Sequence, residues 1–103
     1  MIVTIFRNRL VPENQPEYYD AAAKMSKLAR AMPGYVSHKA FTADDGERVT
    51  IVEFADEASH KAWAFHPEHV ATKLRGRDGF YAEYRLQVCS VTRASKFTRR
   101  DGA

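Results

Sequence analysis

Two histidines three positions apart, His66 and His69, are the side chains of this sequence best suited to moving a proton at neutral pH. An unperturbed histidine titrates at about pH 6.5, so a small change in its surroundings decides its charge. His66 precedes Pro67, a residue favoured in the first turn of a helix, and we therefore expect His66 to cap that helix. His69 lies one turn further on, where it either faces a pocket as a base or lies on the surface.

The other reactive side chains have structural interpretations. Cys89 is the single cysteine and falls within a predicted strand, where an inert buried thiol is expected. Tyr81 and Tyr84 are more typical of packing than of proton donation, and Arg75 and Arg77 are more typical of solvated charges than of anion binding. The sequence contains no glycine-rich phosphate loop and no Cys/His spacing typical of a metal module. We therefore expect no metal site.

The chain has 103 residues, of which 45% are apolar and 28% are charged, as in ordinary globular proteins. This length suits one domain and is short for two. We expect residues 1–92 to form that domain and residues 93–103 to form a basic C-terminal tail. No window approaches the roughly 20 apolar residues of a membrane span, and charge interrupts the first residues where a signal peptide would be apolar. These features point to the cytoplasm.

The net charge of +3 is confined to the C-terminal tail. Residues 1–92 carry 12 lysines and arginines against 12 aspartates and glutamates, whereas residues 93–103 carry four basic residues against Asp101. Binding to a nucleic-acid backbone requires a basic face on the folded body. The balanced body therefore argues against a nucleic-acid partner.

Residue types and spacing predict the order strand, helix, strand, strand, helix, strand. Asn14, followed by Pro16 and Glu17, is typical of a helix start, and apolar residues then recur every three or four positions up to Met32. We expect strands over 2–9, 35–41, 49–54 and 80–91, helices over 14–32 and 56–63, and a short helical piece ending near 74. This order is typical of an α+β, ferredoxin-like βαββαβ fold with a four-stranded antiparallel sheet and its helices on one face.

The predicted strands are apolar on both faces. In the first strand, Ile2 and Phe6 share one face while Val3 and Ile5 share the other. The last strand places Phe80, Tyr84, Leu86 and Val88 on one side and Tyr81, Cys89 and Val91 on the other. At about 25 cal/mol per Å² of apolar area, leaving one such face in water would forfeit several kcal/mol. We therefore expect a homodimer formed sheet against sheet; the alternative is a monomer whose tail folds over the sheet.

Several short motifs in this order resemble the antibiotic biosynthesis monooxygenase family of the dimeric α/β barrel superfamily. They are Met32-Pro33-Gly34-Tyr35, Asp45 to Phe54, Ala62-Trp63, His66-Pro67-Glu68-His69 and Gly76 to Tyr81, and the resemblance runs over residues 1–92. It implies a ferredoxin-like dimeric α/β barrel, in agreement with the order of elements. The family includes cofactor-independent oxygenases of polyketide quinones, haem-degrading monooxygenases and members without known activity, so membership constrains fold more than chemistry.

The resemblance also implies site residues. Similar oxygenases place an asparagine at the end of the first strand and a tryptophan on the second helix, and Asn8 and Trp63 match these positions. Asn8 could donate a hydrogen bond to a substrate oxygen, and Trp63 could donate through its indole nitrogen while packing on an aromatic ring. The structural alternatives are that Asn8 ends the strand and Trp63 is core. With His69 as candidate base, these are the expected catalytic residues; the expected substrate-binding residues are Phe6, Phe65 and Tyr84.

Haem-degrading members carry an axial histidine roughly ten residues after the tryptophan, a position that falls on Thr72 and Lys73 here. His66 and His69 come too early, which disfavours haem. We therefore expect a cofactor-independent monooxygenase of an aromatic or quinone-like small molecule. The alternatives are a non-catalytic small-ligand-binding dimer and a haem-binding monooxygenase.

Overall fold

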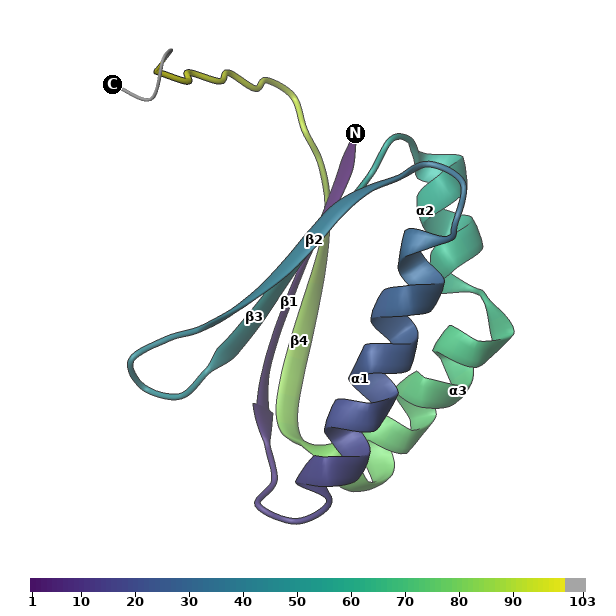
Figure 1. The fold of residues 1–103 in the computed structure, drawn as a ribbon, viewed down its shortest axis with the longest axis vertical. Helices are drawn as coiled ribbons and strands as arrows, with labels where there is room; N and C mark the ends of the chain where they lie inside the picture. Colours follow the sequence, from purple (N-terminus) through teal and green to yellow (C-terminus); the bar gives the residue numbers. More distant parts are fainter. Residues whose placement is uncertain (100–103) are drawn as a thin grey trace.

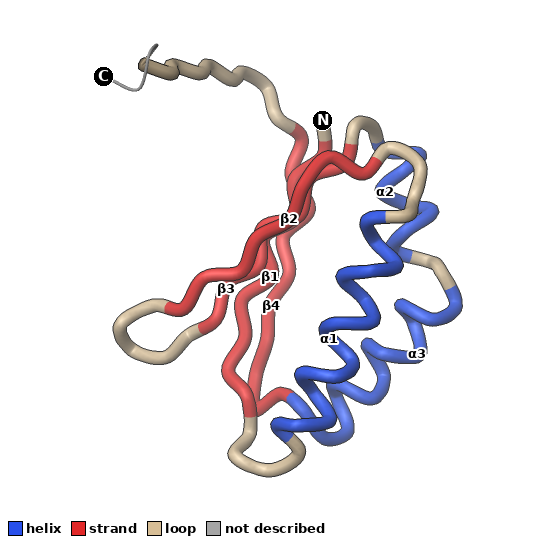
Figure 2. The backbone as a smooth tube through the Cα atoms, in the orientation of Figure 1, coloured by secondary structure: helices blue, strands red, loops and turns tan. Residues whose placement is uncertain are grey.

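The computed structural model describes residues 1–99, which form one antiparallel sheet with all helices on one side of it (Figure 1). The strands are β1 (Ile2–Leu10), β2 (Tyr35–Thr42), β3 (Arg48–Phe54) and β4 (Tyr81–Ser90). The helices are α1 (Gln15–Arg30), α2 (Glu57–Ala64) and α3 (Pro67–Arg75), followed by a π-helical turn, η1 (Gly76–Phe80). The strand order is β2-β3-β1-β4. The predicted ferredoxin-like α+β fold is therefore confirmed, and Figure 2 shows its two layers, strands in red and helices in blue.

Local capping explains where α2 and α3 begin. The Asp56 carboxylate accepts from the backbone N–H of Ser59 at 2.8 Å, and the Ser59 hydroxyl oxygen accepts from the Asp56 N–H, which is a reciprocal capping box. His66 Nδ1 accepts from the Glu68 N–H at 3.2 Å, so the predicted capping role of His66 is confirmed. These caps set the break between the two helices.

Helix α1 begins close to the predicted position, but Asn14 does not cap it with its side chain. Asn14 does precede the helix, but its backbone is left-handed (φ 61°) and its side chain makes no capping bond. Its amide instead donates to the carbonyl of Gly79 at 3.1 Å. The helix start is therefore tied to η1 across the domain, and the predicted Asn14 capping box is wrong.

The segment before β4 was expected to be a loop and is η1. The Tyr81 ring lies where a side chain on Gly76 would be, which explains why only glycine fits there. The pairing of β1 with β4 shifts register between Arg9 and Leu10. Because of this shift Tyr81 packs on the helix side, against Tyr18 and Phe80. Simple alternation predicts that Tyr81 and Cys89 share a face, and this prediction is wrong.

The core between sheet and helices consists of two separate clusters. One, near the start of α1, contains Tyr18, Ala21 and Phe80. The other, at the opposite end of the helix, contains Ala29, Phe54 and Trp63. The two clusters therefore anchor opposite ends of α1 in the domain.

The helix layer leaves one strand largely uncovered. On β4, Tyr84, Leu86 and Val88 share the side of the sheet that bears the helices, because they pair with the helix-side residues of β1. They are nevertheless 39%, 49% and 54% exposed. We call these three residues the β4 strip. It is an apolar surface on the side of the sheet where the rest of the core lies.

The opposite side of the sheet, here called the outer face, combines apolar and charged residues. Val3, Ile5, Val49 and Ile51 lie at its centre and are half-buried. Arginines and acidic residues lie toward the β2–β3 turn, where Arg7 pairs with Glu47 and Arg9 pairs with Asp45.

Residues 91–99 contain no helix or strand and extend away from the sheet (Figure 1). Phe97 in this segment is 82% exposed, so the described part of the predicted tail does not cover the sheet; residues 100–103 of that tail lie outside the described range. Across residues 1–99, none of the helices combines the length and the apolar character needed to cross a membrane.

Phe54 anchors the second cluster, since its side chain is fully buried against Trp63 and Ala29. Phe54→Ala is expected to lower the free energy of unfolding by about 3–5 kcal/mol, because it removes a buried ring and leaves a cavity. Urea denaturation followed by circular dichroism measures the change. Phe97→Ala is the matched control and should change stability by less than about 0.5 kcal/mol; equal effects of the two variants would contradict the assignment of the core.

Candidate functional site

Three polar side chains lie in a row across β3, β1 and β4 on the helix side of the sheet. Asn8 pairs with Arg48 of β3 on one side and with Tyr84 of β4 on the other. Residues opposite one another on neighbouring strands have side chains about 5 Å apart. Arg48, Asn8 and Tyr84, here called the polar row, therefore form one continuous surface beside the β4 strip.

Asn8 is buried without a hydrogen-bond partner. Its side chain is 2% exposed, and neither its Nδ2 nor its Oδ1 has a partner among residues 1–99. An unpaired buried polar group costs about 1–3 kcal/mol, so such groups are rare and call for an explanation. The asparagine is thus held at the sheet surface with both a donor and an acceptor available.

Arg48 is the second unpartnered member of the row. Its Nε is buried without a partner among the described residues. Its guanidinium lies 5.6 Å from the ring centres of both Tyr18 and Tyr19 on α1. Aromatic faces attract a cation through the ring quadrupole, so these rings hold the charge in place without neutralising it.

Tyr84 is held differently from its two neighbours. Arg77 Nε in η1 donates to the Tyr84 hydroxyl at 2.7 Å. The Tyr84 ring also lies 5.6 Å from that of Phe6, which is half-buried on the same side of β1. Two predicted substrate-binding residues, Phe6 and Tyr84, are thus brought together beside Asn8.

Trp63 and His69 form a second group on the helices. Their rings stack face to face, with centroids 4.1 Å apart and planes at 13°. His69 Nδ1 lies 3.0 Å from the backbone carbonyl oxygen of Trp63. A carbonyl only accepts, so Nδ1 carries the proton and donates it, which leaves Nε2 as the lone-pair nitrogen.

Burial makes this histidine a weak base. It lowers the pKa of His69 to about 4, against the opposing effect of the hydrogen bond to Trp63, with a smaller contribution from the positive charge of Lys73. Burial likewise raises the pKa of the Tyr81 hydroxyl, which also lies beside Tyr18. Both groups are therefore neutral near pH 7.

Phe65 is the predicted site residue that the structure does not bring to either group. It follows α2 directly and is 74% exposed. Trp63 is buried in the second core cluster, which agrees with the alternative interpretation of this residue as part of the core. Its stacking on His69 gives it a second contact besides packing.

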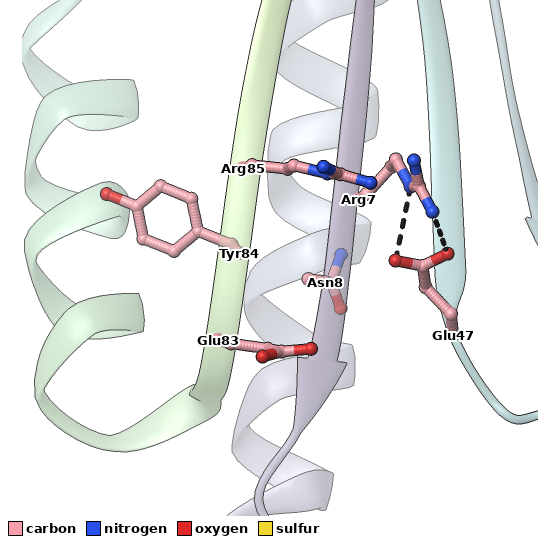
Figure 3. A pocket seen from close by; sticks show the side chains of 6 residues that line it. All are labelled: Arg7, Asn8, Glu47, Glu83, Tyr84 and Arg85. Carbon is pink, nitrogen blue, oxygen red and sulfur yellow. Dashed lines mark hydrogen bonds and ion pairs between the residues drawn. The ribbon is translucent and has the colours of Figure 1, made fainter.

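A depression of about 250 Å³ adjoins the polar row at the β2–β3 turn end of the sheet (Figure 3). It is lined by Arg7, Asn8, Glu47, Glu83, Tyr84 and Arg85. Arg7 and Arg85 are opposite one another on β1 and β4, and Figure 3 shows Tyr84 pointing away from both. The charged residues belong to the outer face, and Tyr84 is the one member of the β4 strip that also lines the depression.

The residues present do not fit haem. Both nearby histidines have local partners, since His66 caps α3 and His69 donates to Trp63 while stacked on its ring. The position ten residues after Trp63 is Lys73. Residues 1–99 also contain no group of three or more His, Cys, Asp or Glu side chains placed to hold a metal ion.

Arg48 is the site residue that the sequence analysis missed, although it lies within one of the quoted motifs. Alternation along β3 places it on the same side as Thr50, Val52 and Phe54. A charged residue at a helix-facing position was therefore the available signal. That it lacks an acidic partner depends on the fold and could not be seen in the sequence.

Together the fold and the site define a small ferredoxin-like α+β protein whose candidate site lies between the helices and the sheet. Residues 1–75 match the family described as antibiotic biosynthesis monooxygenase. The chain belongs to this family, which confirms the resemblance seen in its motifs.

Individual relatives agree with this assignment. The protein YqjZ of Bacillus subtilis, described as uncharacterized, is 31% identical over 85 residues, covering 82% of this chain and 75% of the relative. A putative antibiotic biosynthesis monooxygenase from Deinococcus radiodurans superimposes with a TM-score of 0.82 at 7% identity, over 96% of this chain and all of the other. SnoaB of Streptomyces nogalater, a cofactor-independent oxygenase, superimposes with a TM-score of 0.74 at 14% identity, over 90% of this chain and 94% of the other. At these identities the structural matches show the shared fold.

The depressed pKa of His69 predicts that the protein loses stability in acid. The unfolded chain takes up a proton at about pH 6.5 and the folded chain at about 4, so stability falls as the pH is lowered between these values. His69→Phe retains an aromatic ring but cannot titrate. The loss of unfolding free energy between pH 7 and pH 4.5 should therefore be smaller in this variant by about 2 kcal/mol. Urea denaturation at the two pH values tests this; an equal loss in both proteins would contradict it.

Proposed function

We propose that the protein is a cofactor-independent monooxygenase of an aromatic, anthrone- or hydroquinone-like small molecule. The observation that carries the proposal is Asn8, a buried amide with free donor and acceptor, beside the apolar β4 strip. Family membership supports oxygenase chemistry, and the similar fold of SnoaB, a cofactor-independent oxygenase, supports chemistry without a cofactor.

The substrate itself can supply the electrons in such a reaction. Loss of a proton from an anthrone CH₂ group gives an anion whose negative charge lies largely on the ring oxygen. The carbon of this anion attacks O₂, and the peroxide anion so formed takes back from the solvent the proton that was lost. Loss of water from the resulting hydroperoxide leaves a carbonyl, so that one oxygen atom enters the product and the other leaves as water. The protein's part is to stabilise the anion and to hold it away from bulk water.

The two groups of residues divide these tasks. The Asn8 amide donates to the oxygen on which negative charge develops. Phe6 and Tyr84 contact the ring system from the sheet, and the β4 strip extends this apolar surface. On the helix side, Trp63 orients His69 through the carbonyl bond and the ring stack, so that Nε2 accepts a hydrogen bond from the substrate.

Oxygen uptake with 1,8-dihydroxyanthrone tests the proposal. Asn8→Ala should lower kcat/KM about a hundredfold, because it removes the donor to the developing oxyanion. Trp63→Leu keeps an apolar side chain but removes the ring on which His69 stacks, and is expected to lower the rate about tenfold. Lys61→Ala, an exposed position on α2, is the matched control and should leave the rate unchanged. Unchanged uptake in both site variants would remove these residues from the mechanism.

A non-catalytic ligand-binding role is the second candidate. It is favoured by one observation, namely that a histidine whose pKa is about 4 is a poor base for removing a proton from carbon or phenol. Binding of the anthrone without oxygen uptake, at any pH between 6 and 9, would support this role over the oxygenase.

We also propose that the chain forms a homodimer through the outer face. The central apolar residues Val3, Ile5, Val49 and Ile51 have no covering layer among residues 1–99. Covering them with the same face of a second copy would remove apolar surface from water on both chains. The charged groups near Arg7 would then lie at the rim.

Ile51→Lys should convert this dimer to a monomer, since it buries an unpaired ammonium at the centre of the interface. Sedimentation velocity of wild type and variant at the same concentration measures the change. Ala23→Lys, on the exposed side of α1, is the control and should remain dimeric. A monomeric wild type at micromolar concentration would contradict the proposal.

A further inference from the structure

We propose that Arg48 is a substrate-binding residue and that the ligand of the site is an aromatic acid, with a carboxylate attached to the ring system. The inference deepens the proposed function, because it names the substrate class of the same site. It rests on the arrangement of the polar row and not on the oxidation step.

The arginines on the two faces of the sheet differ in whether they have acidic partners. On the outer face, Arg7 makes a two-pronged pair with Glu47 at 2.8 and 3.1 Å, and Arg9 pairs with Asp45 at 2.8 Å. Arg48 follows Glu47 directly but points to the other side, and no carboxylate among residues 1–99 lies within ion-pair distance of it. Two acids of the β2–β3 turn, Asp45 and Glu47, are thus already paired on the outer face, and the helix-side arginine has no acidic partner among residues 1–99.

The neighbours of Arg48 hold its charge without cancelling it. Tyr18 and Tyr19 present aromatic rings to the guanidinium, and the nearby Tyr81 hydroxyl stays neutral because burial raises its pKa. An arginine is protonated at every physiological pH. A cation that is partly buried and permanently charged is best matched by a ligand group that is permanently anionic.

This requirement favours a carboxylate over a phenol. A phenol titrates at about pH 10, so it would enter the site mostly as a neutral group and would leave Arg48 unpaired. A carboxylate is ionised throughout the neutral range, and guanidinium–carboxylate hydrogen bonds are among the strongest in proteins.

Asn8 completes the recognition of such a group. It is the neighbour of Arg48 across the β1–β3 pair, and its amide offers two N–H donors and a carbonyl acceptor that have no partner among residues 1–99. The donor can share the carboxylate with Arg48, and the acceptor can take a hydrogen bond from a hydroxyl on the adjacent ring carbon. Beyond Asn8, Tyr84 and the rest of the β4 strip provide the apolar surface for the ring system.

Isothermal titration calorimetry with three related probes tests the inference. The probes are 1-hydroxy-2-naphthoate, its methyl ester, and 1-naphthol, which lacks the carboxyl group. We expect the acid to bind wild type at least tenfold more tightly than either neutral probe. Arg48→Gln should remove this preference while leaving the affinity for the ester within about twofold, and Arg48→Lys should retain part of it.

Arg30→Gln is the matched control, because it removes an equal charge from an exposed position at the end of α1 and should keep the full preference for the acid. Thermal denaturation of Arg48→Gln and Arg48→Lys checks that both variants are folded, and a cooperative transition is expected for each. Equal binding of acid and ester to wild type, a preference that survives in Arg48→Gln, or no binding of any probe would each overturn the inference.

These outcomes are separable from those of the oxygen-uptake experiment. Arg48-dependent binding of the acid without oxidation of any substrate would leave the inference standing and contradict the oxygenase. If Arg48→Gln oxidises 1,8-dihydroxyanthrone at the wild-type rate and wild type shows no preference for the acid, the oxygenase proposal stands and the inference about Arg48 is contradicted.

Discussion

The incomplete cover of the sheet is the constraint on which the other features depend. Three helices lie over four strands, and the two core clusters fill the ends of the interface without meeting in the middle. In a chain of this size the helix layer cannot both pack at the two ends and extend over an edge strand. The helix side of β4 is therefore left exposed at Tyr84, Leu86 and Val88, and the polar row ends on this strand at Tyr84.

The polar row would be a defect if the domain served only to be stable. Burying an amide and part of a guanidinium without partners weakens the folded state, and an apolar replacement of similar size would pack at lower cost. Such groups persist in binding sites because a ligand completes their hydrogen bonds. Asn8 and Arg48 lie on strands that are paired on both sides, so the sheet fixes their backbone positions.

The sequence predicted the elements well because their signals are local. The His66 cap and the alternation in β1 are each set by a few neighbouring residues, and each is confirmed. What the sequence could not show were long-range effects. Asn14 bonds to Gly79 across the domain, and Tyr81 changes side through a register shift. Arg48 has no acidic partner in the described part of the chain, and the adjacent Glu47 pairs with Arg7 on the other face. The stack of His69 on Trp63 likewise depends on how two helices meet.

The register shift between β1 and β4 has a consequence for the whole last strand. Side chains along a strand alternate between the two faces of the sheet. Whether the number of residues between α3 and β4 is odd or even therefore determines which β4 side chains face the helices. With η1 as it is, Tyr84, Leu86 and Val88 face the helix side, while Arg85, Gln87 and Cys89 face outward. Inserting or deleting a single residue in η1 would exchange these two sets. The outer face would gain an aromatic and two aliphatic side chains, and Arg85, Gln87 and Cys89 would take their places on the helix side.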